Sequence, residues 1–292
     1  MLFLLLSILS STILVVIMKL YARFGIDTFQ AIVFNYFTCV LSGWVAFGEF
    51  PIPVATLTQE PWFPYTLVLG IFFIGGFTIV GFTVQRFGMT VASVMQKMSM
   101  LMAVFFTIVT YNESLSLLKM LGIAIAIAAI FFSNYSNEPA NETNPKRNWV
   151  LWLLPILTLL TSGVIDTLLY YIQRTVSPNC NTVHLISTIF GIAACLGTLG
   201  LSYQLLTKKA TFAWKNVLGG IALGIPNFGS MYFLVKTFTQ GWEGSVVFPI
   251  NNVGIIALSS LIAFAFLKEE ITRYKLIGVV LAGLSIAIIA MS

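Results

Sequence analysis

The stretch Gly88–Phe132, GMTVASVMQKMSMLMAVFFTIVTYNESLSLLKMLGIAIAIAAIFF, occurs a second time in related form at Gly244–Ile288, GSVVFPINNVGIIALSSLIAFAFLKEEITRYKLIGVVLAGLSIAI. Each copy is a long apolar segment, a short polar elbow with an acid, and a second apolar segment. A shift of 156 residues aligns Gly88 with Gly244, Gln96 with Asn252, Glu113 with Glu269, Lys119 with Lys275, and Gly122 with Gly278. A repeat of this length indicates a duplicated domain.

The composition places the chain in the membrane. Of its 292 residues 58% are hydrophobic and only 9% are charged, whereas a soluble domain has roughly 25% charged residues. The net charge of +5 lies mostly in short connections, so it bears on membrane topology and not on nucleic acid. The three cysteines show no metal or disulfide spacing, and we expect no metal and no cofactor.

Apolar runs of about 20 residues recur along the chain, the length at which a helix crosses roughly 30 Å of hydrocarbon. Because lipid offers the backbone no hydrogen-bond partners and the runs are too long for barrel strands, we predict an all-α integral membrane protein. The ten predicted transmembrane helices are 2–21, 29–48, 64–85, 89–111, 116–133, 149–173, 183–206, 214–238, 244–267 and 273–291.

A long polar segment separates five of these helices from the other five. The predicted organisation is a first five-helix repeat at 1–133, a polar linker at 134–148 and a second five-helix repeat at 149–292. Because five is odd, the second repeat enters the membrane from the opposite side. The chain therefore consists of two inverted repeats, a common transporter construction.

The lysines and arginines are distributed unevenly between the two predicted sides. Eleven of the fifteen fall on one side, three (Lys119, Arg174 and Lys236) on the other, and Lys97 lies inside a helix. The side richer in Lys and Arg is normally cytoplasmic. We predict a multi-pass protein of the plasma (inner) membrane with both termini outside and the linker inside.

The two elbows resemble those of a known family. Asn112-Glu113-Ser114-Leu115-Ser116 and Lys268-Glu269-Glu270-Ile271-Thr272 are similar to the elbow of the drug/metabolite transporter superfamily, EamA type, in which an acid precedes Leu or Ile and then Ser or Thr. With the ten spans in two halves, the resemblance covers the whole chain. It implies a secondary transporter whose central cavity is lined largely by the first, third and fourth helices of each half.

This resemblance leaves the substrate open, because the superfamily carries amino acids, sugars, nucleotide sugars and cationic drugs. It also conflicts with the topology predicted above. Members of the superfamily are usually described with both termini cytoplasmic, the reverse of what the Lys and Arg count predicts.

Lys97 is the charged residue most deeply placed in a predicted helix. It lies about eight residues after Met89, or ~12 Å along a helix, and a Lys at such depth costs roughly 2.5–3.5 kcal/mol on insertion scales. We predict that Lys97, with Gln96 beside it, binds an anionic group of the substrate. The alternative is a structural ion pair.

Asp166 is the acid placed well inside a predicted helix, and Tyr170 shares its helix face one turn later. We predict that Asp166 couples transport to protons and that Tyr170 contributes to binding. The alternative is a structural acid near the outer interface. Counting from the span ends places Asp166 in the outer half of the membrane and Lys97 in the inner half, so we expect no direct pairing between them.

Polar residues next to prolines form the remaining candidate set. Asn251 and Asn252 follow Pro249, and Asn227 follows Pro226. Proline removes a helix hydrogen bond, and broken helices at the bilayer midplane are where transporters bind solutes. We predict that these amides line the substrate pocket. The alternative is that they form hydrogen bonds between helices.

We therefore expect a secondary active transporter that moves a small metabolite with an anionic group by alternating access, with proton coupling as an open question. A channel or a membrane scaffold is the alternative. A membrane enzyme is less favoured, because the chain has one His and no Ser–His or Cys–His arrangement. The expected partners are a small metabolite and the lipid bilayer, with no nucleic acid, and the chain is expected to act as a monomer.

Overall fold

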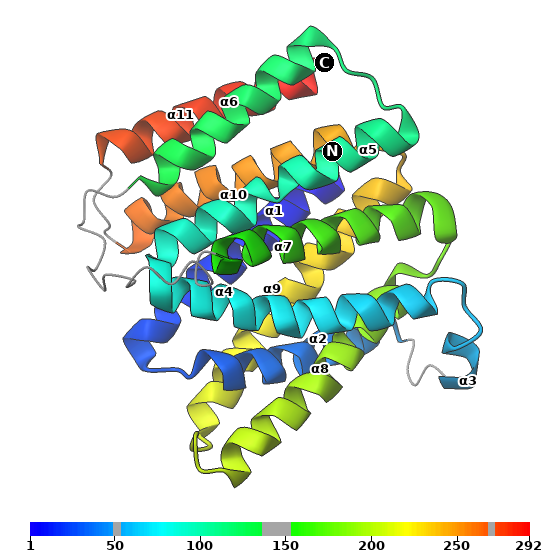
Figure 1. Cartoon of the computed structure of the whole chain (residues 1–292), viewed down its shortest axis with the longest axis vertical. Coiled ribbons are helices and arrows are strands. Elements are labelled where there is room, and N and C mark those ends of the chain that lie inside the picture. Colours follow the sequence, from blue (N-terminus) through cyan, green and yellow to red (C-terminus); the bar gives the residue numbers. More distant parts are fainter. Residues whose placement is uncertain (49–53, 136–152, 268–271) are drawn as a thin grey trace. The chain divides into compact units, whose positions relative to one another are not determined.

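The computed structural model describes residues 1–48, 54–135, 153–267 and 272–292. Within them ten helices are long and apolar enough to cross a membrane (Figure 1). They are Leu2–Phe24, Thr28–Phe47, Phe63–Gly88, Val91–Tyr111, Leu117–Asn134, Leu153–Val176, Thr182–Leu206, Trp214–Thr239, Gly244–Phe266 and Arg273–Ala290. The predicted spans and the all-α membrane fold are confirmed, with span ends shifted by a few residues.

The chain forms two compact units that do not follow the two halves of the sequence. The first unit comprises residues 1–74 and 168–240, and the second comprises 75–167 and 241–292. Each unit thus takes segments from both predicted repeats. The predicted division at 1–133, 134–148 and 149–292 concerns sequence repeats and remains a prediction, since most of the linker lies outside the described residues.

In the first unit α9 (Trp214–Thr239) packs against both α1 (Leu2–Phe24) and α2 (Thr28–Phe47), and α8 (Thr182–Leu206) packs against α2. Gly220 and Gly224 of α9 lie so close to the α2 backbone that a Cβ atom at either would collide with it. Two glycines four residues apart on one helix face thus allow α9 and α2 to cross closely. The first unit also contains α3 (Val54–Leu57) and the π-helical turn η2 (Ile172–Val176).

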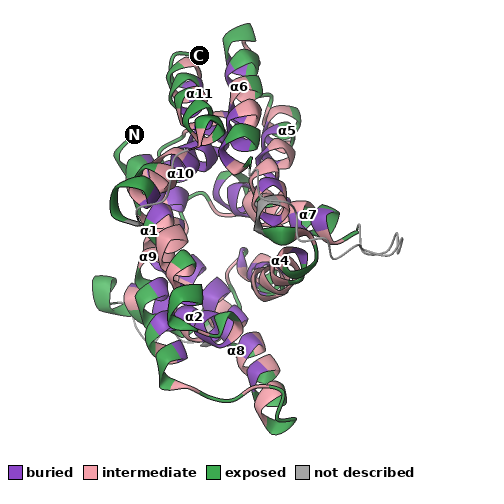
Figure 2. Cartoon of the chain, turned by 90° about the vertical axis from the view of Figure 1, so that its left-hand side faces the viewer, coloured by how far each residue is buried: buried purple, intermediate pink, exposed green. Residues whose placement is uncertain are grey.

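The second unit contains α5 (Met100–Tyr111), α6 (Leu117–Asn134), α10 (Gly244–Leu267) and α11 (Arg273–Ala290). It also holds most of α4 (Phe63–Met98) and α7 (Leu153–Tyr171), which both continue into the first unit. Helices α6 and α11 lie side by side in both views (Figures 1 and 2). Figure 2 shows them buried where they meet and exposed on the opposite face.

Helices α6 and α11 contact each other at two places that are related by the 156-residue shift of the repeat. Gly122 of α6 packs against Ile289 of α11, and Gly278 of α11 packs against Ser133 of α6. The same 156-residue shift that aligns Gly122 with Gly278 also aligns Ser133 with Ile289. The beginning of each helix meets the end of the other, so the two are antiparallel and related by the inverted repeat.

The Ser or Thr of each elbow begins the helix that follows it. The Ser116 hydroxyl accepts a hydrogen bond from Lys119 N at 3.0 Å, and the Thr272 hydroxyl accepts one from Lys275 N at 3.3 Å. Such N-caps replace a hydrogen bond that the first helical turn lacks. The repeated Ser/Thr is therefore a helix-start signal, used once in each half.

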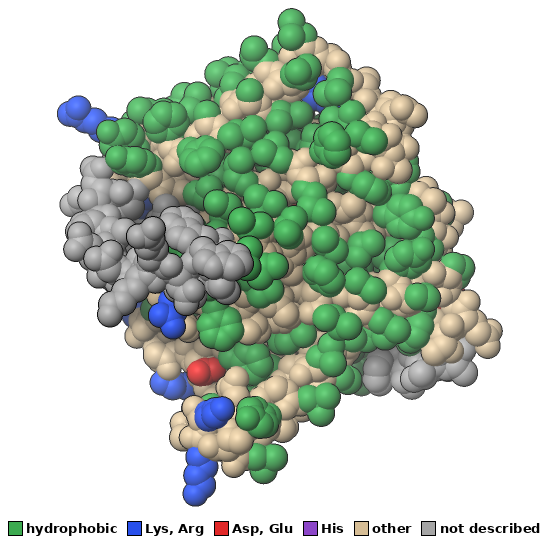
Figure 3. All heavy atoms as spheres, viewed as in Figure 1, with side chains coloured by type: hydrophobic (Ala, Val, Ile, Leu, Met, Phe, Trp, Pro, Cys, Tyr) green, Lys and Arg blue, Asp and Glu red, His purple; other side chains and the backbone are tan. Residues whose placement is uncertain are grey.

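The outward faces of α5, α6 and α11 are apolar (Figure 3). Phe105, Leu117 and Val280 expose 69%, 81% and 63% of their surfaces. Large apolar side chains on so many outer positions are stable only against lipid. The described part of the chain is thus a multi-pass membrane protein.

Candidate functional site

The predicted site residues divide between the two units. Five of them belong to the second unit: Gln96, Lys97, Asp166, Asn251 and Asn252. Tyr170 and Asn227 belong to the first unit. The two groups are described separately.

Lys97 and Asp166 interact electrostatically in the second unit, and both side chains are half-buried. The two charges lie closer than the counted depths suggest, but these two described residues form no direct ion pair, so the expectation of no direct pairing is not contradicted. Counting residues from the ends of two spans ignores how the helices tilt and cross. The intramembrane Lys has an intramembrane carboxylate nearby.

The crossing of α5 and α7 explains this approach. Gly163 of α7 packs against the Met102 side chain, so closely that a Cβ atom would collide with it. Asp166 follows Gly163 by three residues, and Ser99 precedes Met102 by three. The Asp166 carboxyl accordingly interacts with Ser99 as well as with Lys97.

Ser99 marks a small interruption in the helix that carries Lys97. Helix α4 ends at Met98 and α5 begins at Met100. The Ser99 hydroxyl donates to the Gln96 carbonyl at 2.7 Å, and Ser99 is 1% exposed. A serine hydroxyl bonded back to the preceding turn tends to bend a helix. One local irregularity thus lies two residues after Lys97, and a sharper one precedes it at Gly88, whose φ of 86° kinks α4.

The predicted proline breaks are not found. Helix α10 runs through Pro249, and α9 runs through Pro226. A single proline removes one helix hydrogen bond but leaves the remaining turns packed against their neighbours, so the helix continues. Asn251 and Asn252 are each 8% exposed, and Asn252 Nδ2 donates to the Phe248 carbonyl one turn earlier at 3.1 Å.

The other predicted binding residues have mixed surroundings. The Gln96 side chain is exposed. Tyr170 is fully buried and packs edge-to-face on Phe238, with ring centroids 5.0 Å apart. Asn227 Nδ2 donates to Asn35 Oδ1 at 3.1 Å. This last contact is the interhelical hydrogen bond that was the alternative for Asn227.

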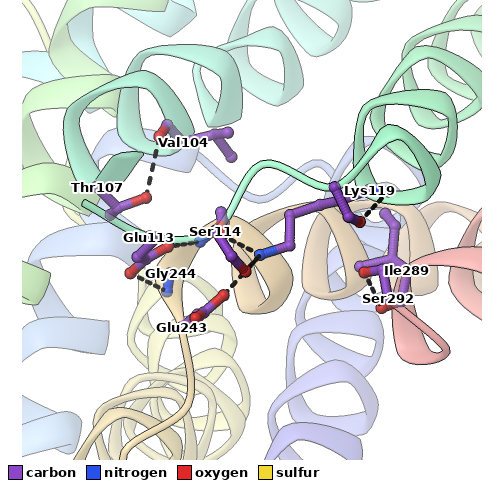
Figure 4. A network of polar contacts seen from close by, with 11 residues as sticks. Val104, Thr107, Glu113, Ser114, Lys119, Glu243, Gly244, Ile289 and Ser292 are labelled. Carbon is purple, nitrogen blue, oxygen red and sulfur yellow. Dashed lines mark hydrogen bonds and ion pairs between the residues drawn. The ribbon is translucent and has the colours of Figure 1, made fainter. Parts of the chain in front are cut away.

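The first elbow makes a polar network that the sequence indicates only in part (Figure 4). The two carboxylate oxygens of Glu113 accept hydrogen bonds from Gly244 N at 3.0 Å and Ser245 N at 2.8 Å. These are the first backbone N–H groups of α10, so the repeated acid caps the helix that begins the second copy of the repeat. Its counterpart Glu269 lies outside the described residues.

Lys119 is the residue of this network whose role the sequence misses. We expect it as a charge on the outer side of the membrane, but it is 1% exposed and its Nζ lies 2.6 Å from Glu243 Oε2. Lys119 Nζ also donates to the hydroxyls of Ser245 at 3.2 Å and Ser114 at 3.4 Å. The sequence signal was a Lys in the first turn of a helix, a position where an exposed cation is unfavourable.

Among the described residues, no group of three or more His, Cys, Asp or Glu side chains is placed to hold a metal ion. The described part of the second unit offers a chemistry of single charges and amides. It comprises one Lys–Asp pair half-buried in the membrane region, two buried Asn residues, and a satisfied ion pair at the elbow.

Known proteins resemble this chain in sequence and in fold. Residues 1–135, which include the first elbow, match the EamA-like transporter family, which confirms the resemblance that this elbow indicates. An uncharacterized protein of Haemophilus influenzae is 25% identical over 282 residues, which cover 94% of this chain and 92% of the relative. An uncharacterized transporter of Archaeoglobus fulgidus is 30% identical over 144 residues, about half of each chain at 48% and 47%.

A solved crystal structure of another protein superposes with a TM-score of 0.80, covering 99% of this chain and 96% of the other. Its sequence is only 13% identical, so it supports the fold alone. Together these comparisons support a membrane transporter in general terms. None of them names a substrate.

Proposed function

We propose that this chain, whose first 135 residues are EamA-like, is a secondary active transporter for a small metabolite with an anionic group. It acts by alternating access in the plasma membrane, and it is not an enzyme. The observation that carries the proposal is the interaction of Lys97 with Asp166 inside the membrane region. Charged groups at such depth usually mark substrate or ion pathways.

In this proposal the substrate anion competes with Asp166 for Lys97. A carboxylate or phosphate at the Lys97 ammonium gains a charge-assisted hydrogen bond, which is strong at low dielectric. The anion must displace a carboxylate that already neutralises the ammonium. Protonation of Asp166 removes that competing charge.

Proton coupling follows from this competition. The empty site carries the Lys97 ammonium and the Asp166 carboxylate, whose charges cancel. The loaded site carries the ammonium, the substrate anion and a neutral, protonated Asp166, and these balance too. One proton therefore accompanies one anionic charge, and neither state leaves an unpaired charge in the low-dielectric interior.

The amides supply the neutral part of the proposed site. Asn251 and Asn252 present donors and acceptors within the same unit as Lys97, and Gln96 is next to Lys97 in sequence. We keep Asn227 and Tyr170 as proposed binding residues of the first unit, although each already has a protein contact. Among the proposed binding residues, we expect replacement of these two to change substrate affinity least.

The proposed orientation places both termini outside, from the Lys and Arg distribution. The burial of Lys119 strengthens that distribution, because this Lys no longer contributes a surface charge to the outer side. A reporter that is active only in the cytoplasm, fused after Ser292, should be inactive. Activity of that fusion would restore the orientation usual in the superfamily.

Transport itself is tested with purified protein in proteoliposomes. A thermal-shift screen of metabolites first identifies a ligand, since a ligand stabilises the state that it binds. Uptake of that ligand is then measured with and without an imposed pH gradient. Accumulation against a concentration gradient supports a coupled transporter, equilibration without accumulation indicates a channel, and chemical conversion of the ligand indicates an enzyme.

A further inference from the structure

A polar pocket of about 450 Å³ lies in the first unit, apart from the residues of the proposed transport site. It forms where the turn between α1 and α2 meets the turn between α8 and α9. Its lining includes three lysines, Lys208, Lys209 and Lys215, and one carboxylate, Asp27. Figure 3 shows Lys and Arg side chains gathered around the end of the first unit where α8 meets α9.

The floor of this pocket is held by buried amides. Asn216 is 2% exposed and Gln30 is 1% exposed. Asn216 Oδ1 accepts from Asp27 N at 2.9 Å, and Asn216 Nδ2 donates to Gln30 Oε1 at 2.9 Å. Gln30 Nε2 in turn donates to the Thr211 carbonyl at 2.7 Å. These bonds join two segments of chain, 27–30 and 211–216, and so hold the floor of the pocket in place.

The lysines of the pocket come from the two sides of the turn between α8 and α9. Lys208 adopts a left-handed conformation with φ of 55°, which turns the chain sharply and carries Lys208 and Lys209 on one turn. Lys215 Nζ lies 3.5 Å from the Phe24 carbonyl on the other side. The Asp27 carboxylate is partly used within α2, where it accepts from Gln30 N at 2.8 Å. Three ammonium groups therefore outnumber the single carboxylate.

The start of α9 adds to this positive potential. The N-cap residue of this 26-residue helix is Ala213, which makes no side-chain cap hydrogen bond, and Ala213, Lys215 and Asn216 all line the pocket. The first N–H groups of a helix and its dipole favour a bound anion, and phosphate is the usual one. Lysine side chains and a helix N-terminus thus meet at the same pocket.

The surroundings of the pocket are those of a membrane surface. Trp214 and Phe212 are 74% and 47% exposed and pack edge-to-face, with ring centroids 5.6 Å apart. Leu206 and Leu218, which flank the same turn, are 84% and 65% exposed. Exposed aromatic residues at span ends lie at the level of lipid headgroups. Basic pockets at that level bind anionic headgroups.

We propose that this pocket binds a phosphate group, and that the phosphate belongs to an anionic phospholipid of the adjacent leaflet. Free inorganic phosphate offers the same charge and the same oxygen acceptors. The aromatic and leucine rim favours the lipid, because a soluble ion gains nothing from it. The site is independent of the proposed transport site and of the direction in which the chain crosses the membrane.

The test uses the full-length protein, delipidated in detergent, with phosphatidylglycerol, phosphatidylcholine or inorganic phosphate as probes. Native mass spectrometry measures retained lipid, and thermal unfolding measures the effect of phosphate. The variant Lys208→Gln/Lys209→Gln/Lys215→Gln removes the pocket cations. The matched control Arg23→Gln/Arg86→Gln/Arg273→Gln removes the same charge from exposed residues outside the pocket.

The parent should prefer phosphatidylglycerol to phosphatidylcholine. Each pocket lysine should contribute about fivefold, so Lys215→Gln alone weakens binding about fivefold and the triple variant about a hundredfold. The control triple should keep most of the preference. An equal loss in both triple variants overturns the proposal. Stabilisation by inorganic phosphate that disappears in the lysine triple, with no preference between the lipids, overturns the lipid assignment and leaves a site for free phosphate.

Discussion

Two Lys–carboxylate pairs of the second unit differ in how completely their charges are satisfied. At the elbow, Lys119 is 1% exposed and bonds directly to Glu243 at 2.6 Å, with two serine hydroxyls as further acceptors. In the span, Lys97 and Asp166 are half-buried and interact electrostatically, and the Asp166 carboxyl also interacts with Ser99.

This difference separates a structural pair from a pair that is available to a ligand. Every donor of the elbow ammonium has an acceptor, so a substrate anion would have to break good bonds to reach it. The Lys97 ammonium has its compensating charge but not such a set of acceptors. Charge pairs that are only partly satisfied are the ones whose partners can be exchanged at low cost.

The largest expected difference between the two lysines is in their effect on substrate affinity. Lys97→Met should weaken binding of an acidic substrate by about 2–5 kcal/mol, because a desolvated charge contact is lost. Lys119→Met is the matched control, since it removes the satisfied lysine, and its Kd should stay within a few fold of the parent. Isothermal titration with the ligand from the screen measures both. Equal losses of affinity in the two variants would contradict the distinction between a ligand-accessible and a structural pair.

A loss of affinity in Lys97→Met must be separated from misfolding. That variant leaves the Asp166 carboxylate without its ammonium, so some loss of stability is expected. The double variant Lys97→Met/Asp166→Asn removes both charges and should unfold at a higher temperature than the single variant. It should still fail to bind the acidic substrate. Recovery of binding in the double variant would show that Lys97 acts only as a counter-ion.

The next effect concerns stability at the elbow, and it is asymmetric. Glu243→Gln leaves the buried Lys119 ammonium without a carboxylate and should lower the unfolding free energy by about 3 kcal/mol. Lys119→Met instead leaves the Glu243 carboxylate, which is 39% exposed and stays hydrated. This variant should therefore lower the unfolding free energy by clearly less than Glu243→Gln does. Unfolding in mixed micelles compares the two. The opposite order would mean that Lys119 is not the desolvated partner.

The smallest expected effect is at the helix cap. Glu113→Gln keeps one carbonyl oxygen for the two N–H groups of α10 and removes the negative charge at the helix start. We expect a loss of about 1.5–2 kcal/mol, the lower part of the range for one hydrogen bond to a charged group. Ser114→Ala, a neighbouring elbow change that spares the cap, should cost less in the same unfolding assay. If both changes were equally mild, the cap would not contribute to the fold.

The fold could be predicted from sequence because its signals are local. Apolar runs of span length fixed the ten helices, and the repeat fixed their inverted arrangement. The elbow pattern has a direct physical meaning, since Ser116 and Thr272 begin their helices and Glu113 caps α10. Even the aligned Gly122 and Gly278 proved to be equivalent crossing points.

The site was less predictable because it depends on how helices cross. Nothing in the spacing of Lys97 and Asp166 along the chain indicates that the contact of Gly163 with Met102 draws them together. The burial of Lys119 likewise depends on Glu243, which is distant in sequence. Pro249 was misleading for the opposite reason, since a strong local signal was overridden by packing along α10.

The central claim is that Asp166 couples proton movement to anion transport through Lys97, and Asp166→Asn in proteoliposomes tests it most directly. The variant should lose substrate accumulation driven by a pH gradient, because the amide can neither release a proton nor compete as an anion. It should retain exchange of external for internal substrate, because exchange needs no net protonation cycle. Undiminished gradient-driven accumulation in Asp166→Asn would contradict the claim and return Asp166 to a structural role.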